Sequence, residues 1–174
     1  MRMEADLSGL SSLLNGCAAV ALLALAAGSA GAAAAQSRPV MIVPQNERFI
    51  CTPTAVWDGD GPIWCAEGPH VRLQGIAARE IDGSCRDSQP CPAASGVEAR
   101  DALVLLLGGA KGSLSSGHVR VAGSRMACQS FGSARGNRTA ALCRLPDGRD
   151  LSCALVRDGS VLRWARYGGD RLCR

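Results

Sequence analysis

Residues 49–65 read FICTPTAVWDGDGPIWC, a stretch with a short polar sequence between two mainly apolar ends. Its two ends, residues 49–57 and 63–65, are mainly apolar runs of the kind that form strands. Between them, Asp-Gly-Asp-Gly at residues 58–61 is typical of a tight turn. Glycine adopts backbone angles that other residues disfavour, and an aspartate side chain can hydrogen-bond to the nearby backbone. The stretch therefore predicts a β-hairpin.

The chain after this hairpin continues with a third strand and then a helix. Residues 70–75 (HVRLQG) alternate strictly, with polar and apolar side chains on opposite faces. Residues 82–94 hold glycine, serine, proline and two cysteines, which indicates a loop. Ser95 and Glu98 fit a capping box, so we expect a helix that begins there and runs through Leu107.

The second half of the chain adds further strands and a closing helix. We expect strands within residues 119–128 and 139–145, a turn at 146–148, and a short helix over 151–157. Strands, an inserted helix, more strands and a terminal helix follow one another in the order of an OB-fold. The predicted fold is α+β and β-rich: a five-stranded OB-like barrel with two or three helices.

The first 35 residues differ from the rest. A charged start is followed by an uncharged run of Leu, Ala, Val, Gly and Ser that ends in small residues, which predicts a signal peptide over residues 1–35. A retained membrane anchor is the alternative, because the run is long enough to span a bilayer. Residues 36–48 are expected to be a linker or first edge segment, and residues 49–174 the folded domain. We expect a periplasmic or secreted bacterial protein, without stable membrane association once the signal is removed.

The charge balance is mildly basic. The chain has net charge +4, and residues 1–35 carry one arginine against two acidic residues, so the remainder is +5. Lys111 is the only lysine, so the positive charge is almost all arginine. Guanidinium groups suit bidentate phosphate binding, although a basic balance alone favours an anionic partner only weakly.

Eight cysteines remain after residue 35, an even number that predicts a disulfide framework in an exported domain. Two of them flank the first hairpin, two close a short loop, two flank a later turn, and the last two lie in the final helix and the tail. The expected pairs are Cys51–Cys65, Cys85–Cys91, Cys128–Cys143 and Cys153–Cys173. No C-x2-C pair occurs and both histidines are isolated in the sequence, which argues against zinc.

Three short features carry candidate chemistry, and each has an ordinary explanation when taken alone. Asp58 and Asp60 would sit in a plain hairpin turn. Arg72 and Glu80, eight residues apart, could form a surface ion pair of little consequence. Arg138, beside a glycine-rich turn, could be a solvated loop residue.

Taken together, these features resemble the thermonuclease (staphylococcal-nuclease-like) family. VWDGD at 56–60 resembles its V-x-D-G-D-T opening, and RLQGIAARE at 72–80 resembles R-[IL]-x-[GL]-[IV]-D-[AT]-P-E with the same Arg-to-Glu spacing. FGSARGNRT at 131–139 resembles its D-[KR]-Y-G-R-[TL] turn, and DLSCALVRDG at 150–159 resembles its closing helix. The resemblance extends over roughly residues 50–173, with the motifs in the family's order.

The resemblance implies a role for each matching residue. Arg72 and Arg138 match the two arginines that clamp the scissile phosphate, and Glu80 matches the carboxylate that activates or orients the attacking water. Asp60 matches a calcium ligand, and Asp58 is a possible second one. The implied cofactor is Ca²⁺, whose preferred ligands are carboxylate oxygens.

The sequence departs from the family pattern around the implied metal. The second metal-binding aspartate is replaced by Ala77, the proline by Arg79, and the threonine after DGD by Gly61. We therefore expect Asp60, a backbone carbonyl near Ala78 and water as the remaining ligands. A positive charge from Arg79 is expected close to the cation, so calcium binding should be weak or absent.

Two functions from different classes follow. The first is an exported, calcium-dependent nuclease that hydrolyses phosphodiester bonds of DNA or RNA with little sequence specificity. The second is a catalytically impaired OB-fold module that binds nucleic acid or a protein partner; a structural protein without a ligand is the third possibility. We expect a monomer. The aromatic residues available for stacking on bases are few: Trp57, Trp64, Phe131, Trp164 and Tyr167.

Overall fold

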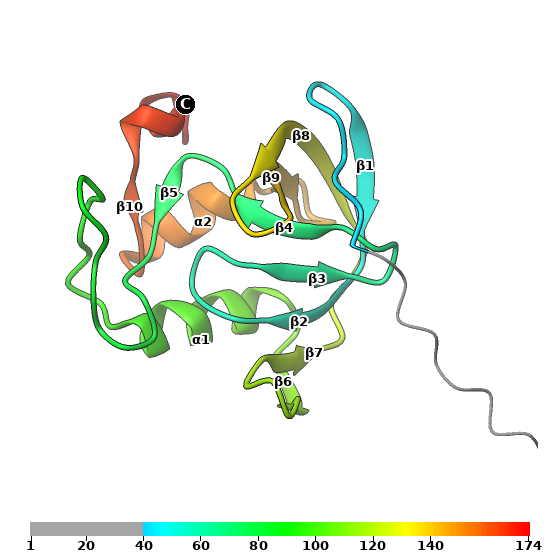
Figure 1. Cartoon of the computed structure of the whole chain (residues 1–174), viewed down its shortest axis with the longest axis horizontal. Helices are drawn as coiled ribbons and strands as arrows, with labels where there is room; N and C mark the ends of the chain where they lie inside the picture. Colours follow the sequence, from blue (N-terminus) through cyan, green and yellow to red (C-terminus); the bar gives the residue numbers. More distant parts are fainter. Residues whose placement is uncertain (1–39) are drawn as a thin grey trace, which may run out of the picture. The chain divides into compact units, whose positions relative to one another are not determined.

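The computed structural model describes residues 40–174, which belong to one compact unit spanning Ser37–Arg174 (Figure 1). The predicted signal peptide over 1–35 lies outside the described residues. Within the described part of the chain, no helix is long and apolar enough to cross a membrane.

Ten strands, two α-helices and two short 3-10 helices make up the fold, which confirms the β-rich prediction. The strands are β1 (Arg48–Cys51), β2 (Pro53–Val56), β3 (Ile63–Cys65), β4 (His70–Leu73), β5 (Ile76–Ala77), β6 (Ala110–Ser113), β7 (Val119–Val121), β8 (Met126–Ala134), β9 (Arg138–Arg144) and β10 (Leu162–Arg163). The helices are α1 (Gly96–Leu106), α2 (Leu151–Asp158), η1 (Ala165–Tyr167) and η2 (Gly169–Arg171).

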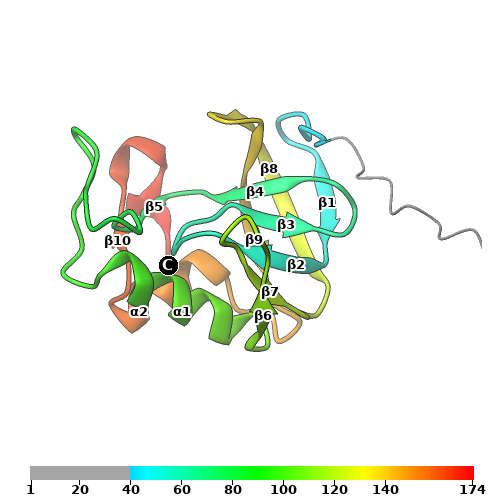
Figure 2. The same ribbon diagram turned by 60° about the horizontal axis from the view of Figure 1, so that its bottom comes forward.

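Eight of the strands form a single curled sheet. Its order is β1-β8-β9-β4-β3-β2-β7-β6, and β5 pairs separately with β10. The sheet bends into a half-barrel with β1 and β6 at its two ends (Figures 1 and 2). The predicted number of five strands is too low, because the structure divides the chain into ten shorter strands and its main sheet is open.

The break between β1 and β2 shows why the count differs. The apolar run at 49–57 looks continuous, but the carboxylate of Glu67 accepts hydrogen bonds from both the N–H and the hydroxyl of Thr52, at 2.8 and 2.7 Å. β1 therefore pairs with β8, whereas β2 pairs with β3 and β7. One sequence run thus serves two parts of the sheet.

Both helices form where their end signals predict. Ser95 and Glu98 make the expected capping box at the start of α1. Asp150 caps α2 by accepting a bond from the Cys153 N–H at 2.8 Å, and Gly159 ends it in the left-handed region. α1 and α2 lie together on one side of the sheet (Figure 2).

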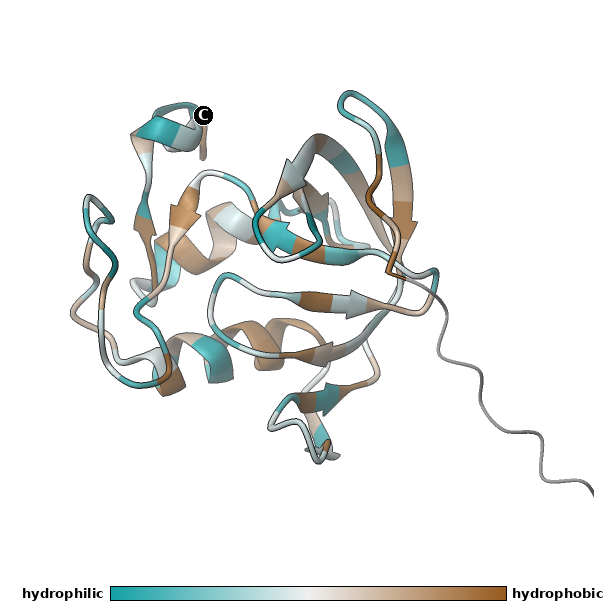
Figure 3. Ribbon diagram, viewed as in Figure 1, coloured by the Kyte–Doolittle hydropathy of each residue, from teal (hydrophilic) through white to brown (hydrophobic). Residues whose placement is uncertain are grey.

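The core lies between these helices and the concave side of the sheet. Its largest fully buried side chains include Ile63, Leu73, Leu103, Met126 and Leu155, which come from strands and both helices. Figure 3 shows apolar segments on α1, α2 and the inner strands, and hydrophilic colouring at many loop tips. Burial of this apolar surface stabilises the half-barrel.

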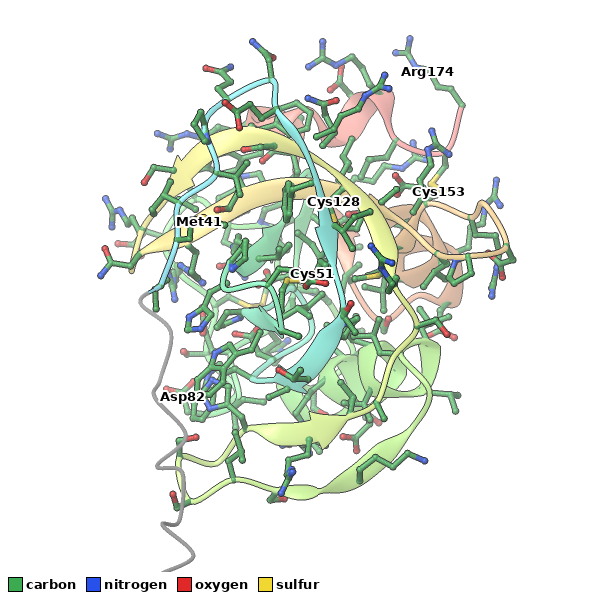
Figure 4. The ribbon with its side chains drawn as sticks, turned by 90° about the vertical axis from the view of Figure 1, so that its right-hand side faces the viewer. Met41, Cys51, Asp82, Cys128, Cys153 and Arg174 are labelled. Carbon is green, nitrogen blue, oxygen red and sulfur yellow. A yellow bond between two sulfur atoms is a disulfide. The ribbon has the colours of Figure 1, made fainter. Side chains whose placement is uncertain are left out.

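Four disulfides join the pairs that the sequence predicts: Cys51–Cys65, Cys85–Cys91, Cys128–Cys143 and Cys153–Cys173. Cys128 and Cys143 are direct cross-strand neighbours in β8 and β9. Cys153 lies on α2 close to the end of the chain at Arg174 (Figure 4). Disulfides of this number are consistent with an oxidising compartment.

The segment before β1 packs along the sheet. Met41 forms a parallel bridge with Pro69. The Val43 N–H donates to the Thr139 hydroxyl at 3.0 Å, and its carbonyl accepts from the Ser130 hydroxyl at 2.8 Å. Residues 40–48 therefore behave as an edge segment of the domain.

Candidate functional site

Arg72 and Arg138 belong to adjacent parallel strands. Along β4, Val71 and Leu73 are buried while Arg72 is half-buried on the other face, as the alternation predicts. β4 and β9 pair in parallel with Arg72 opposite Ala140. Arg138 is the first residue of β9, so this pairing brings together two arginines that are 66 positions apart (138 − 72).

The DGD turn lies directly beneath Arg72. Asp58 and Asp60 are only 6% and 5% exposed, and the Asp60 N–H donates to Asp58 Oδ1 at 3.1 Å. The turn can approach α1 because Gly59 has no side chain: a Cβ there would collide with the Cβ of Ala99. The predicted turn is therefore a buried one, held against the helix.

The carboxylate of Asp60 is shared between two protein donors. Its Oδ1 forms an ion pair with Arg72 Nη1, which lies 3.3 Å from the Asp60 carbonyl as well. Its Oδ2 accepts the Ala78 N–H at 3.0 Å. Asp60 thus links β4 to the segment that carries Glu80.

Glu80 is positioned by the start of α1 and by the loop that follows Glu80 itself. A Cβ on Gly96 would collide with the Glu80 carbonyl, so this glycine permits the close approach. The Glu80 N–H donates to the Ser84 carbonyl at 2.9 Å. The Glu80 side chain is paired with Arg86, whose Nε lies 2.7 Å from Oε1.

Arg138 follows a three-residue turn between β8 and β9. Gly136 and Asn137 both adopt positive φ angles, +74° and +55°, a region that glycine and asparagine tolerate best. Arg138 Nε donates to the Arg135 carbonyl at 2.6 Å, which fixes the base of the guanidinium.

The charges of these groups act on one another. Burial lowers the pKa of Arg72 to about 10; Arg138 and Arg86 lower it too, while Asp58 and Glu80 raise it. Burial also lowers the pKa of Arg138, with the same two carboxylates opposing. Crowded, partly desolvated guanidiniums of this kind gain stability from a bound anion.

The carboxyl of Asp58 has a strongly perturbed pKa. Burial raises its pKa from 3.8 to about 7, and the nearby Glu80 charge raises it too, although Arg72 and Arg138 act in the opposite direction. A shift of this size at a cluster of charged residues is a common mark of a functional site.

A pocket of about 460 Å³ opens over the arginines. Arg72, Arg86, Arg135 and Arg138 line it, together with the backbone around Gly75. Within the described chain, Asp58, Asp60 and Glu80 do not line this pocket; the first two lie behind Arg72 and the third meets it through Arg86. A larger hollow of about 640 Å³ beside α2 and the tail contains none of the predicted catalytic or metal-binding residues.

Three aromatic residues complete the pocket wall: Phe131, Trp164 and Tyr167. Trp164 and Tyr167 pack edge to face, with ring centroids 4.7 Å apart. The tail that carries them reaches the pocket because Gly169 lies against Gly75, where a Cβ would collide with the Gly75 carbonyl. The pocket therefore combines positive charge with partly exposed aromatic side chains.

A second aromatic cluster is centred on His70, which lies on the same face of β4 as Arg72, two residues earlier. His70 stacks on Trp64 with centroids 4.8 Å apart and an interplanar angle of 3°. His118 contacts both Trp64 and Trp57, at 4.3 and 5.1 Å. Burial lowers the pKa of both histidines, which favours uncharged, stacking rings at neutral pH.

The residues present do not fit a calcium ion. Both oxygens of Asp60 are engaged by protein donors, and Asp58 Oδ1 accepts the Asp60 N–H. The Ala78 carbonyl, expected as a ligand, accepts a hydrogen bond from the side chain of Gln89. No group of three or more His, Cys, Asp or Glu side chains that could hold a metal is found among residues 40–174.

The sequence led us to expect the charge of Arg79 close to the implied cation position. The structure instead directs its guanidinium to the loop after Glu80. Its two terminal nitrogens donate to the carbonyls of Gly83 and Pro92, both at 2.8 Å. The guanidinium braces the loop after Glu80, because two backbone carbonyls there match its fork of donors.

Two residues of the cluster are absent from the sequence-based prediction. Arg86 and Gln89 lie between Cys85 and Cys91, and only the docking of that loop brings them to Glu80 and Ala78. An arginine adjacent to a cysteine in a short closed loop was the one available signal. Comparison of the chain with protein-family models, with curated proteins and with solved structures found no match.

Proposed function

We propose that this protein is an exported nuclease of the thermonuclease type, which binds DNA or RNA and hydrolyses phosphodiester bonds as a monomer. The observation that carries the proposal is the convergence of Arg72 and Arg138 on one pocket, with Glu80 and Asp58 within electrostatic range. In this proposal the curled sheet corresponds to an elaborated OB barrel.

The chemistry asks for the groups that this cluster holds. A water oxygen bonds to phosphorus while the bond to the leaving oxygen breaks, and negative charge builds on the phosphoryl oxygens. Arg72 and Arg138 would stabilise that charge with their fork-shaped donors. Glu80 would accept the proton from the attacking water, and the leaving oxygen would take a proton from solvent.

The pocket also suits the rest of a nucleotide. Phe131 and Tyr167 are 37% and 44% exposed and stand beside the arginines, so a base can stack while its phosphate meets the guanidiniums. Stacking of this kind tolerates any base, which agrees with low sequence specificity.

A binding module without catalysis is the second candidate, and two observations favour it. Glu80 is already paired with Arg86, and the carboxylate of Asp60 has no oxygen left without a protein donor. The cluster of Trp57, Trp64, His70 and His118 offers further stacking surface near Arg72.

Binding and cleavage of labelled oligonucleotides separate the two candidates. For a nuclease, Glu80→Gln lowers the cleavage rate by about 10²–10⁴ and keeps binding, because only the water-activating group is lost. Arg72→Gln and Arg138→Gln lose both. The matched control is Arg149→Gln, because Arg149 is also an ion-paired arginine, at 2.7 Å from Asp147, and lies outside this pocket. Binding without any cleavage by the wild type leaves the binding module.

A further inference from the structure

The loop after Glu80 is closed on itself by the Cys85–Cys91 disulfide. Two of the residues inside this ring contact the site. Arg86 pairs with the Glu80 carboxylate, and the Gln89 amide donates to the Ala78 carbonyl. The loop is therefore docked on both residues that flank Arg79.

Arg86 faces the same pocket as Arg72 and Arg138. Its ion pair with Glu80 uses Nε, one of five N–H donors on a guanidinium, and 57% of its side chain is exposed. Its charge lowers the pKa of both other arginines, so the three groups share one field. A phosphate entering the pocket would meet three guanidiniums.

The loop also supplies a donor at the position where a cation was implied. Gln89 bonds the Ala78 carbonyl, while Arg72 and the Ala78 N–H take the Asp60 carboxylate. Arg86 pairs with Glu80 and lines the pocket, so it supplies the pocket with a positive charge that requires no metal.

We propose that Arg86 is the third guanidinium of the anion site, positioned by the Cys85–Cys91 bridge, so that phosphodiester binding needs no divalent cation. This inference rests on the proposed function, because it takes the same pocket as the phosphate site. A ring of this size restricts the loop, so less conformational entropy is lost when Arg86 binds.

The test is fluorescence anisotropy with a fluorescein-labelled, phosphorothioate-linked single-stranded DNA in EDTA, using disulfide-intact protein. Wild type should bind, and Arg86→Gln should weaken binding about tenfold, the effect of losing one charge-assisted hydrogen bond. The slope of log K against log salt should fall by about 0.7, as expected for one phosphate contact fewer. Arg149→Gln has the same 57% side-chain exposure and should bind like wild type.

The bridge is tested by Cys85→Ser/Cys91→Ser, alone and combined with Arg86→Gln. If the bridge acts through Arg86, the double serine variant weakens binding and the combined variant is no weaker than Arg86→Gln alone. Thermal unfolding of each variant shows that the fold is kept.

The outcomes are distinguishable. Arg86→Gln binding as tightly as Arg149→Gln, or wild-type binding only when calcium is added, overturns this inference while leaving the proposed function in place. An extra loss in the combined variant shows that the bridge positions something other than Arg86. If wild type does not bind, or Arg72→Gln and Arg138→Gln bind as well as wild type, both proposals fail.

Discussion

Arg72 and Asp60 are joined twice: the guanidinium pairs with the Asp60 carboxylate, and the same nitrogen approaches the Asp60 carbonyl at 3.3 Å. The side chains are 18% and 7% exposed, so little water replaces either partner. This link connects the DGD turn to β4 and holds Arg72, the arginine proposed to bind phosphate, in place, while it occupies the carboxylate that the family resemblance assigns to a metal.

Removal of Arg72 alone should be strongly destabilising. Arg72→Gln leaves Asp60 buried without its cation, at a cost of about 3–5 kcal/mol in the free energy of unfolding. Arg72→Gln/Asp60→Asn should recover part of that loss, because no unpaired charge remains, yet should stay inactive. Urea unfolding and cleavage assays on wild type, Arg72→Gln, Asp60→Asn and the double variant check both points. A double variant as unstable as the sum of the single variants contradicts the pairing.

Asp58 should make stability depend on pH. Its folded-state pKa of about 7 lies above the ordinary 3.8, so the folded protein holds this proton more tightly. The stabilisation is therefore complete below pH 3.8 and is lost as pH rises through 7. Between these limits, the free energy of unfolding of Asp58→Asn should rise by about 2–4 kcal/mol relative to that of wild type. Denaturant unfolding measured from acid to mildly alkaline pH tests this, and an unchanged difference between the two proteins argues against it.

Calcium should have little effect on wild-type cleavage up to about 1 mM, the weak end of protein calcium sites. Ala77→Asp adds the carboxylate that the family pattern has, beside Ala78 and Asp60, and should raise the initial rate at limiting calcium. Ala77 is fully buried, so Ala77→Asn is the control for the cost of a polar group there. A wild-type cleavage rate that rises steeply with calcium contradicts the proposal that Arg86, and not a metal ion, supplies the positive charge in the pocket.

The disulfides should differ in their effect on stability. Cys128 and Cys143 are buried cross-strand neighbours separated by 15 residues, so Cys128→Ser/Cys143→Ser should lose about 3 kcal/mol. The Cys85–Cys91 pair spans only 6 residues of a surface loop, so its removal should cost less. Denaturant midpoints of the two double variants rank them. Equal losses indicate that the surface loop supports the core as well as Arg86.

Several elements of this fold can be predicted from short sequence signals. The DGD turn between two apolar runs, the Ser95–Glu98 capping box and the glycine after α2 each predict an element that the structure contains. Two of the disulfide pairs were expected because their cysteines lie about equally far from a turn. Cys128 and Cys143 are indeed cross-strand neighbours, whereas Cys51 lies on β1 and Cys65 on β3, which are not adjacent in the sheet. Such signals act over a few residues, where backbone geometry and side-chain bonding decide the conformation.

The edges of the sheet were not predictable in this way. β6 is exposed along its whole length and shows no alternation, so its sequence carries no strand signal; it forms by pairing with β7. The division of residues 49–57 into two strands depends on Glu67, which reaches back to Thr52 from beyond the hairpin.

The residue types of the candidate site and their spacing can be read from the sequence: Arg72, Glu80 and Arg138, each compatible with an ordinary surface role. The meeting of Arg72 and Arg138 at one pocket depends on the tertiary structure, because the parallel pairing of β4 with β9 sets Arg72 beside the strand that Arg138 begins. The tertiary structure also brought in Arg86, through a docked loop. Contacts between distant segments depend on how the whole sheet curls, and that arrangement leaves no periodic trace in the residues it brings together.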